Sequence, residues 1–211
     1  MSALANMKRK QLEMMLERLE GFSRPSFQRE QYATPACVAA EMLFLAGMRG
    51  ELGTVCDLGC GTGVLAIGAA LLGAKAIGVE IDGEALAIAR RNAKKLDVDV
   101  DFIRADVNSL ALKGIDTVVM NPPFGAQKAS AGDRAFLCIA QKIAKTIYSL
   151  HNLGSEGFMR SFMKPCTVQE IYRIPFPLKR CFEFHSQDVK IIEVELYRIT
   201  CQTLDTRNSR S

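Results

Sequence analysis

The feature that most constrains this chain is a glycine-rich turn between a short apolar segment and a helical one. The turn reads Asp57–Leu58–Gly59–Cys60–Gly61–Thr62–Gly63 and follows the apolar run that begins at Thr54. Glycine accepts positive φ and lets the backbone approach a ligand closely, so such a turn favours a bound ligand at a strand end. Val64 stands where the dinucleotide fingerprint has its last glycine. The spacing therefore argues against NAD and for a cofactor without a pyrophosphate.

Short apolar strands alternate with helices from residue 54 onward. Strands are expected over residues 54–58, 76–81, 101–105, 117–120, 146–150, 168–174 and 191–199, and helices over 64–72, 85–96, 133–144 and 156–163. Two helices are expected before them, one within residues 1–20 and one that Thr34 and Pro35 begin and that runs to about Met48. This alternation predicts an α/β fold, with a mainly parallel sheet covered on both faces and ligands at its C-terminal strand ends.

Acidic residues follow two further strands at the same edge of the predicted sheet. Glu80 lies twenty-one residues after Gly59, at a place suited to hydrogen bonds with ribose hydroxyls. Asp82 is expected to cap the next helix. Asp106 ends the third strand and is expected to accept from an adenine amino group, with a backbone contact from Val107. Together with the turn, this pattern indicates S-adenosylmethionine (SAM) as the cofactor.

The fourth strand runs directly into Asn121–Pro122–Pro123–Phe124. Each proline removes a backbone donor and keeps the residue before it extended, so the turn presents fixed carbonyl acceptors. The Asn121 side-chain oxygen is another acceptor, and Phe124 offers a flat apolar face for a planar group. Beside a methyl donor, two acceptors and a stacking ring suit a conjugated NH₂ group, which they orient without a strong general base. The alternative is a tight Pro-Pro turn that only closes a strand.

Length and composition limit the number of domains, the kinds of partner and the compartment that are expected. Its 211 residues suffice for one domain, divided here into an N-terminal helical segment 1–50, a methyltransferase domain 51–201 and a frayed tail 202–211. The net charge of +4 is compatible with a polyanionic partner and equally with simple solubility. No apolar run reaches membrane-spanning length, so no membrane contact and a cytoplasmic location are expected. The seven cysteines, odd in number and without a C-x-x-C pair, are expected to be reduced thiols without a metal: Cys37, Cys56, Cys60, Cys138, Cys166, Cys181 and Cys201.

Four segments together resemble the methyltransferase-like protein five family within the Asn-Pro-Pro-aromatic amino-methyltransferases. They are Glu30–Pro35, Asp57–Leu65, Asn121–Gly125 and Tyr148–His151, and the likeness extends from the N-terminal helix to the last strand. The resemblance implies a class I SAM-methyltransferase fold: Rossmann-like, doubly wound, with seven mainly parallel strands and the last one antiparallel. It also implies methylation of an adenine N6 in small-subunit ribosomal RNA.

The resemblance carries further expectations about the site and the partners. It places Gln31 and Thr34 at the methionine end of SAM, with Gly59, Thr62 and Val64 lining the loop. It implies RNA as a partner, and a small zinc-containing activator protein such as eukaryotic members use. One departure is the segment Phe184–Lys190, which lacks the lysine-rich loop of the family and so carries less charge for RNA.

Other functions fit the same motif. A glutamine side-chain amide in a protein or an adenine in DNA could occupy the same acceptors, although both usually require an added recognition domain. A ribosome-assembly scaffold without catalysis is the non-enzymatic alternative. His151 is read as a structural residue or a substrate contact, and the loop 125–132 as a lid over the target base or an ordinary surface loop. The basic helix face at Arg90, Arg91, Lys94 and Lys95 is expected to be solvated.

Overall fold

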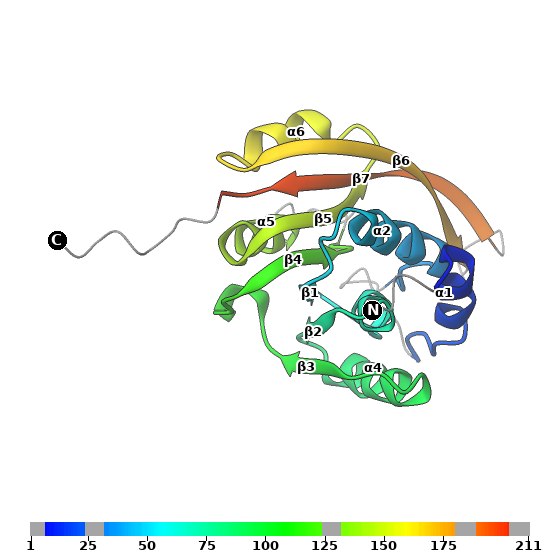
Figure 1. Cartoon of the computed structure of the whole chain (residues 1–211). Helices are drawn as coiled ribbons and strands as arrows, with labels where there is room; N and C mark the ends of the chain where they lie inside the picture. Colours follow the sequence, from blue (N-terminus) through cyan, green and yellow to red (C-terminus); the bar gives the residue numbers. More distant parts are fainter. Residues whose placement is uncertain (1–6, 24–31, 124–131, 180–188, 203–211) are drawn as a thin grey trace.

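A computed structural model describes residues 7–23, 32–123, 132–179 and 189–202 (Figure 1). Helices and strands alternate along most of this chain, as the apolar periodicity predicts. The helices are α1 (Arg9–Leu16), α2 (Ala36–Met48), α3 (Val64–Leu71), α4 (Gly83–Lys95), the short 3-10 helix η2 (Val107–Ser109), α5 (Gly132–Ile143) and α6 (Glu156–Phe162). The strands are β1 (Thr54–Leu58), β2 (Lys75–Glu80), β3 (Val100–Arg104), β4 (Ile115–Met120), β5 (Ala144–Asn152), β6 (Thr167–Lys179) and β7 (Val189–Thr200).

All seven strands form one sheet in the order β3-β2-β1-β4-β5-β7-β6. Strands β1 to β5 pair in parallel, and β7 runs antiparallel to both β5 and β6. This confirms the expected class I methyltransferase fold, including the antiparallel last strand. The strand order reverses between β1 and β4, so the C-terminal ends of these two strands flank the point where such sheets bind ligands.

Two hydrophobic clusters cover the two faces of the sheet. One is built on α1, α2 and α3 and includes Leu12 and Leu16 of α1, so the N-terminal helix packs into the main core. The other is built on α5 and α6, with Leu137 and Met159 fully buried. Strand residues alternate between the clusters, as Val119 and Met120 do. Burial on both faces explains why the strands read as near-continuous apolar runs.

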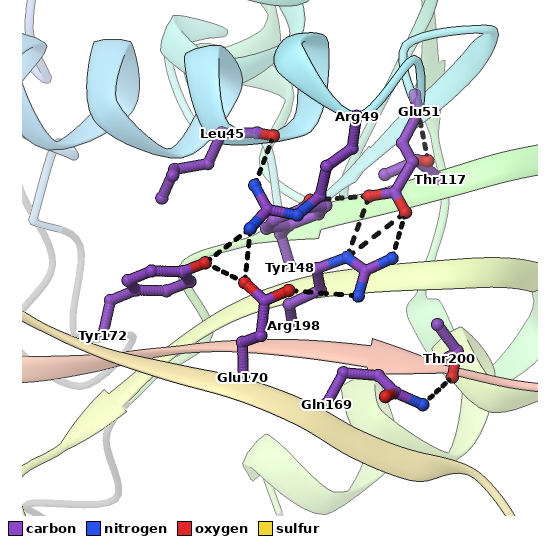
Figure 2. A network of polar contacts seen from close by, with 10 residues as sticks. All are labelled: Leu45, Arg49, Glu51, Thr117, Tyr148, Gln169, Glu170, Tyr172, Arg198 and Thr200. Atoms are coloured by element: carbon purple, nitrogen blue, oxygen red, sulfur yellow. Dashed lines mark hydrogen bonds and ion pairs between the residues drawn. The ribbon is translucent and has the colours of Figure 1, made fainter.

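A polar network ties the C-terminal end of α2 to the sheet (Figure 2). Glu51 accepts from the Nε of Arg198 at 3.1 Å and from the hydroxyl of Tyr148 at 2.6 Å. The Arg198 guanidinium also pairs with Glu170, which in turn pairs with Arg49. Arg49 therefore links the end of α2 to β6 through its ion pair with Glu170, in which the two side chains are 27% and 33% exposed.

Helix α2 starts differently from the sequence prediction. Thr34 was expected to cap the helix, but the residue before the first turn is Pro35, and its N-terminus has no side-chain cap. The Thr34 hydroxyl is instead 3.1 Å from the Nδ2 of Asn121. Asp82 does cap α4, accepting from the Glu84 amide at 2.9 Å, as predicted.

The basic face of α4 is exposed at Arg90, Arg91, Lys94 and Lys95, as predicted, and two of its cations also bind the segment after α1. Arg91 donates to the carboxylate of Glu20 at 3.0 Å, and Lys95 donates to the carbonyl of Arg18 at 2.8 Å. These contacts join residues more than seventy positions apart, so helical periodicity alone could not reveal them.

A disulfide between Cys166 and Cys201 corrects the prediction that all cysteines are reduced. Cys166 directly precedes β6 and Cys201 directly follows β7. The register pairs Thr167 with Thr200, so the two cysteines face each other as the next cross-strand pair. Their Cα atoms are 4.3 Å apart, which suits a disulfide across antiparallel strands. The described free cysteines are Cys37, Cys56, Cys60 and Cys138.

Two absences hold for the described residues. Within them no helix has the length and apolar character needed to cross a bilayer. The same residues contain no cluster of three or more His, Cys, Asp or Glu side chains that could hold a metal ion.

Replacing Glu51 by Ala should lower the free energy of unfolding by about 3–5 kcal/mol, because it leaves Arg198 without its main partner in a site that is mostly buried. The two side chains are only 16% and 17% exposed. Urea denaturation measures the change. Arg9→Ala is the control, since it breaks a more exposed ion pair with Glu41 and should cost less than about 1 kcal/mol. Equal decreases in the free energy of unfolding for the two variants would contradict the claim that burial makes the Glu51–Arg198 pair the stronger one.

Candidate active site

The glycine-rich turn follows β1 in a conformation that requires glycine. Gly59, Gly61 and Gly63 have φ of +72°, +52° and +90°, in the left-handed region. A Cβ on Gly59 would lie 2.8 Å from the Phe136 ring, and one on Gly61 would lie 2.8 Å from the Phe22 ring. The amides of Gly59 and Cys60 both donate to the Val79 carbonyl of β2 at 2.9 Å, which holds the turn against the sheet. The backbone of the turn is therefore fixed and open to close approach.

Asp57, the last acidic residue before the turn, is buried beside the cavity. Its Oδ2 accepts from the Ala66 amide in the first turn of α3 at 3.0 Å. Burial raises the pKa of Asp57 to about 8; the Ala66 hydrogen bond opposes this rise, and the charge of Glu80 adds to it. The carboxyl is thus held neutral around pH 7, and a cation beside it would favour the ionised form.

Glu80 is fixed at the end of β2 by three backbone amides. Its Oε2 accepts from Gly61, and its Oε1 accepts from Ile81 and Asp82, all at 2.9 Å. These bonds orient the carboxylate beside the glycine turn. Asp106 at the end of β3 is held less extensively: its Oδ1 accepts from the backbone and side-chain nitrogens of Asn108, at 2.8 and 2.9 Å.

A cavity of about 500 Å³ lies at this edge of the sheet. Its lining brings together eleven of the predicted site residues from the ends of β1 to β4 and the segment before α2. Gly63 and Pro122 adjoin the lining without being part of it, while Gln31 and Phe124 lie outside the described residues. The predicted residues that line the cavity are Thr34, Asp57, Gly59, Gly61, Thr62, Val64, Glu80, Asp106, Val107, Asn121 and Pro123.

Two buried polar atoms in the lining find no partner among the described residues. They are the hydroxyl oxygen of Thr62 and the Oδ1 of Asn121. The amide nitrogen of Asn121 is engaged with Thr34, so the free oxygen is the acceptor end of an oriented side chain. A buried acceptor without a partner costs about 1–3 kcal/mol. Both atoms therefore suit hydrogen bonds to a ligand.

The pairing of Asn121 with Thr34 joins segments 87 positions apart in the chain. Pro122 and Pro123 follow Asn121 and keep it in extended backbone. The lid expected at residues 125–132 and the loop at Phe184–Lys190 fall largely outside the described residues.

His151 takes no part in the cavity lining. It is 4% exposed, its Nε2 lies 2.7 Å from the Ser149 hydroxyl, and its ring meets Tyr197 edge-on. Burial lowers the pKa of His151 to about 4, so the ring is neutral at physiological pH. These contacts favour its structural interpretation over a substrate contact.

Sequence reasoning missed three features of this site. Phe22, Tyr32 and Phe136 line the cavity from the segment after α1, the segment before α2, and α5. Phe136 falls within the helix expected over residues 133–144, and no role at the site was predicted for any of the three. The signal that could have helped was Asn92, a polar residue on the apolar face of α4; it is fully buried and hydrogen-bonded to the glycine turn.

Comparisons with known proteins agree with this architecture. Residues 38–154 match the family model of the Methyltransferase small domain. The chain is 35% identical to the rRNA N(6)-adenosine-methyltransferase Mettl5 of Drosophila melanogaster, over 95% of this chain and all of that protein. It is 41% identical to MJ0284 of Methanocaldococcus jannaschii, over 91% and 94% of the two chains. The crystal structure of PH1948 from Pyrococcus horikoshii superposes with a TM-score of 0.83 at 35% identity, covering 92% of this chain and 98% of that one.

Asp57 should give the protein a distinctive pH dependence. A carboxyl with an unfolded pKa of about 3.9 and a folded pKa of about 8 contributes stability that is fully present below the lower value and is lost as pH rises through the higher one. Glu80 is the facing acid, and the buried thiol of Cys60 lies in the same turn. Relative to Asp57→Asn, the wild type should therefore lose stability between about pH 5 and pH 8.

Urea unfolding of the two proteins without cofactor, at several pH values across this range, measures the effect. Asn keeps an acceptor for Ala66 and resembles the neutral acid, so the comparison isolates ionisation. Parallel pH profiles for the two proteins would show that burial does not perturb Asp57.

Proposed function

The chain belongs to the Methyltransferase small domain family, and from this premise we propose that it methylates the exocyclic N6 of an adenine in RNA, most directly in small-subunit ribosomal RNA. The Mettl5 relative that matches the chain over its whole length is named for rRNA N6-adenosine methylation. The observation that carries the proposal within this chain is the buried Oδ1 of Asn121, which lines the cavity without a partner among the described residues.

The cavity lining fits SAM as the cofactor. The left-handed glycines allow close approach, the Glu80 carboxylate is held by three amides, and the Thr62 hydroxyl lacks a partner among the described residues. When bound, SAM supplies an electrophilic methyl group carried on its cationic sulfonium. We assign Glu80 to the ribose hydroxyls and Asp106 and Val107 to the adenine. The remaining candidates for cofactor contact are Gln31, Thr34, Asp57, Gly59, Gly61, Thr62, Gly63 and Val64.

The target amino group is held by acceptors of the Asn121–Phe124 turn. Asn121 Oδ1 accepts from one N–H of the adenine amino group, and the Pro122 carbonyl accepts from the other. These bonds draw the nitrogen lone pair out of conjugation and aim it at the methyl carbon. Thr34 takes part by accepting from the Asn121 amide, which leaves the amide oxygen for the substrate. Phe124 is assigned to stacking on the base.

Methyl transfer to the amino group requires no strong base. The N6–carbon bond forms as the sulfonium–carbon bond breaks, and the positively charged amino group then loses one proton to water. The chain's contribution is to position the amino group and to stabilise its developing charge, since acceptors fixed before the reaction need no reorganisation during it.

The activator implied by the family resemblance is the second part of the proposal. Strand β3 ends the sheet order, and an edge strand offers backbone groups to a partner chain. We therefore propose that a small zinc-containing protein supports this enzyme. If it does, the purified chain alone should transfer less methyl to RNA than the chain purified with such a protein.

Asn121→Ala should lower the rate constant kcat for methyl transfer by about 10²–10³-fold, because one preorganised group that stabilises developing charge is lost. Thr34→Val should lower it by about tenfold, since the Asn121 amide loses the hydroxyl that orients it. Gln169→Ala, an exposed amide on β6 bonded to Thr200, is the control and should leave kcat unchanged.

Tritiated methyl transfer to RNA from cells that lack this protein, with nucleosides resolved by chromatography, provides the measurement. Label in N6-methyladenosine that disappears with Asn121→Ala would support the proposal. Label in protein glutamine or in DNA would replace RNA as the substrate. Full complementation of a deletion by Asn121→Ala would instead favour the scaffold alternative.

A further inference from the structure

A short segment after α1 runs from that helix to the glycine turn. This segment, residues Arg18–Ser23, is called the N-terminal strap below. Three neighbouring side chains of α4 bind it: Lys95 donates to the Arg18 carbonyl, Arg91 pairs with the Glu20 carboxylate, and Asn92 binds the Glu20 backbone. The strap is therefore held along α4, on the side where the helix meets the turn.

Asn92 connects the strap to the glycine turn directly. Its Nδ2 donates to the carbonyls of Glu20 and Thr62, both at 3.0 Å, and its Oδ1 accepts from the Glu20 amide at 2.8 Å. The side chain is fully buried. An amide can donate twice and accept once in this way, whereas a carboxylate can only accept. Asparagine is thus suited to joining two carbonyls and one backbone amide at a single point.

The strap places Phe22 against the cofactor loop. Phe22 lines the cavity, and its ring tip would lie 2.8 Å from a Cβ added to Gly61. The Gly61 amide donates to Glu80, the carboxylate assigned to the ribose. The ring therefore covers the turn beside the anchor of that carboxylate.

We propose that Phe22 is a cofactor-contacting residue that forms a wall of the SAM pocket at its ribose side, and that Asn92 is the positioning residue that holds it there. An aromatic ring at this point supplies apolar contact area. It also keeps water from the hydrogen bonds that Glu80 makes, and such bonds are stronger in a drier environment. The inference concerns cofactor binding and does not depend on which base or protein is methylated.

The absence of tryptophan from the chain allows a direct test. In Phe22→Trp the single indole should change its emission, saturably, when S-adenosylhomocysteine is added. Met48→Trp is the matched control, because Met48 is 80% exposed at the opposite end of α2 from Thr34, and its emission should not change. Calorimetric titration of both proteins confirms that the cofactor product binds.

Affinity measurements distinguish a direct contact between Phe22 and the cofactor from a role of Phe22 in stability alone. Phe22→Ala should weaken binding of SAM and S-adenosylhomocysteine by about tenfold, Phe22→Leu should weaken it less, and the melting temperature without ligand should stay close to that of the wild type. Asn92→Asp should weaken binding and, combined with Phe22→Trp, reduce the emission change. Gln169→Ala, which removes an exposed amide on β6 away from the strap, should alter neither.

Wild-type affinity in Phe22→Ala would overturn the proposal. Emission of Phe22→Trp that does not respond to a ligand seen to bind by calorimetry would overturn it as well. If Asn92→Asp does not fold, these Phe22 results still decide the contact, because they do not require that variant. Loss of affinity for SAM with RNA methylation absent even in the wild type would uphold this inference while removing the proposed substrate.

Discussion

The buried hydrogen bond between Asp57 and the Ala66 amide is the interaction on which the site geometry rests. It joins the last acid of β1 to the first turn of α3 and so closes the intervening glycine turn into one fixed shape. The turn then directs its Gly61 amide to Glu80 on the neighbouring strand. Two carboxyl groups on adjacent strands thereby line the cavity, with one made neutral by burial and the other satisfied by backbone amides.

Much of this arrangement could be predicted because it is local in sequence. Apolar periodicity defines the strands and helices. The candidate polar residues lie at or just beyond the C-terminal ends of strands, so parallel pairing brings Asp57, Glu80, Asp106 and Asn121 to one edge. The glycine spacing likewise reports a backbone requirement at the residues that bear it, as their positive φ angles demonstrate. A motif whose residue types are required by the local backbone conformation can therefore be placed in the fold from the sequence.

What could not be predicted depends on contacts between distant segments. Thr34 reads as a helix cap, and only the folded chain reveals Asn121 beside its hydroxyl. Arg91 and Lys95 are exposed as predicted, but helical periodicity does not reveal that both bind the segment after α1. The disulfide depends on the register of β6 against β7, which neither the odd cysteine count nor the cysteine spacing reports. In each case the position of the partner is supplied only by the tertiary structure.

Several of these contacts bring segments before the first strand to the candidate site. Residues before the first strand supply Thr34 to the Asn121 turn and Phe22 to the glycine turn, while α1 is buried in the same core as the sheet. The parallel strands present acceptors and carboxylates at one open edge, but strand ends alone cannot enclose a ligand. Segments that pack across that edge complete the walls, and residues before the first strand are among those that line the cavity. The network of Glu51 and Arg198 lies at the other end of α2, the helix that Thr34 precedes.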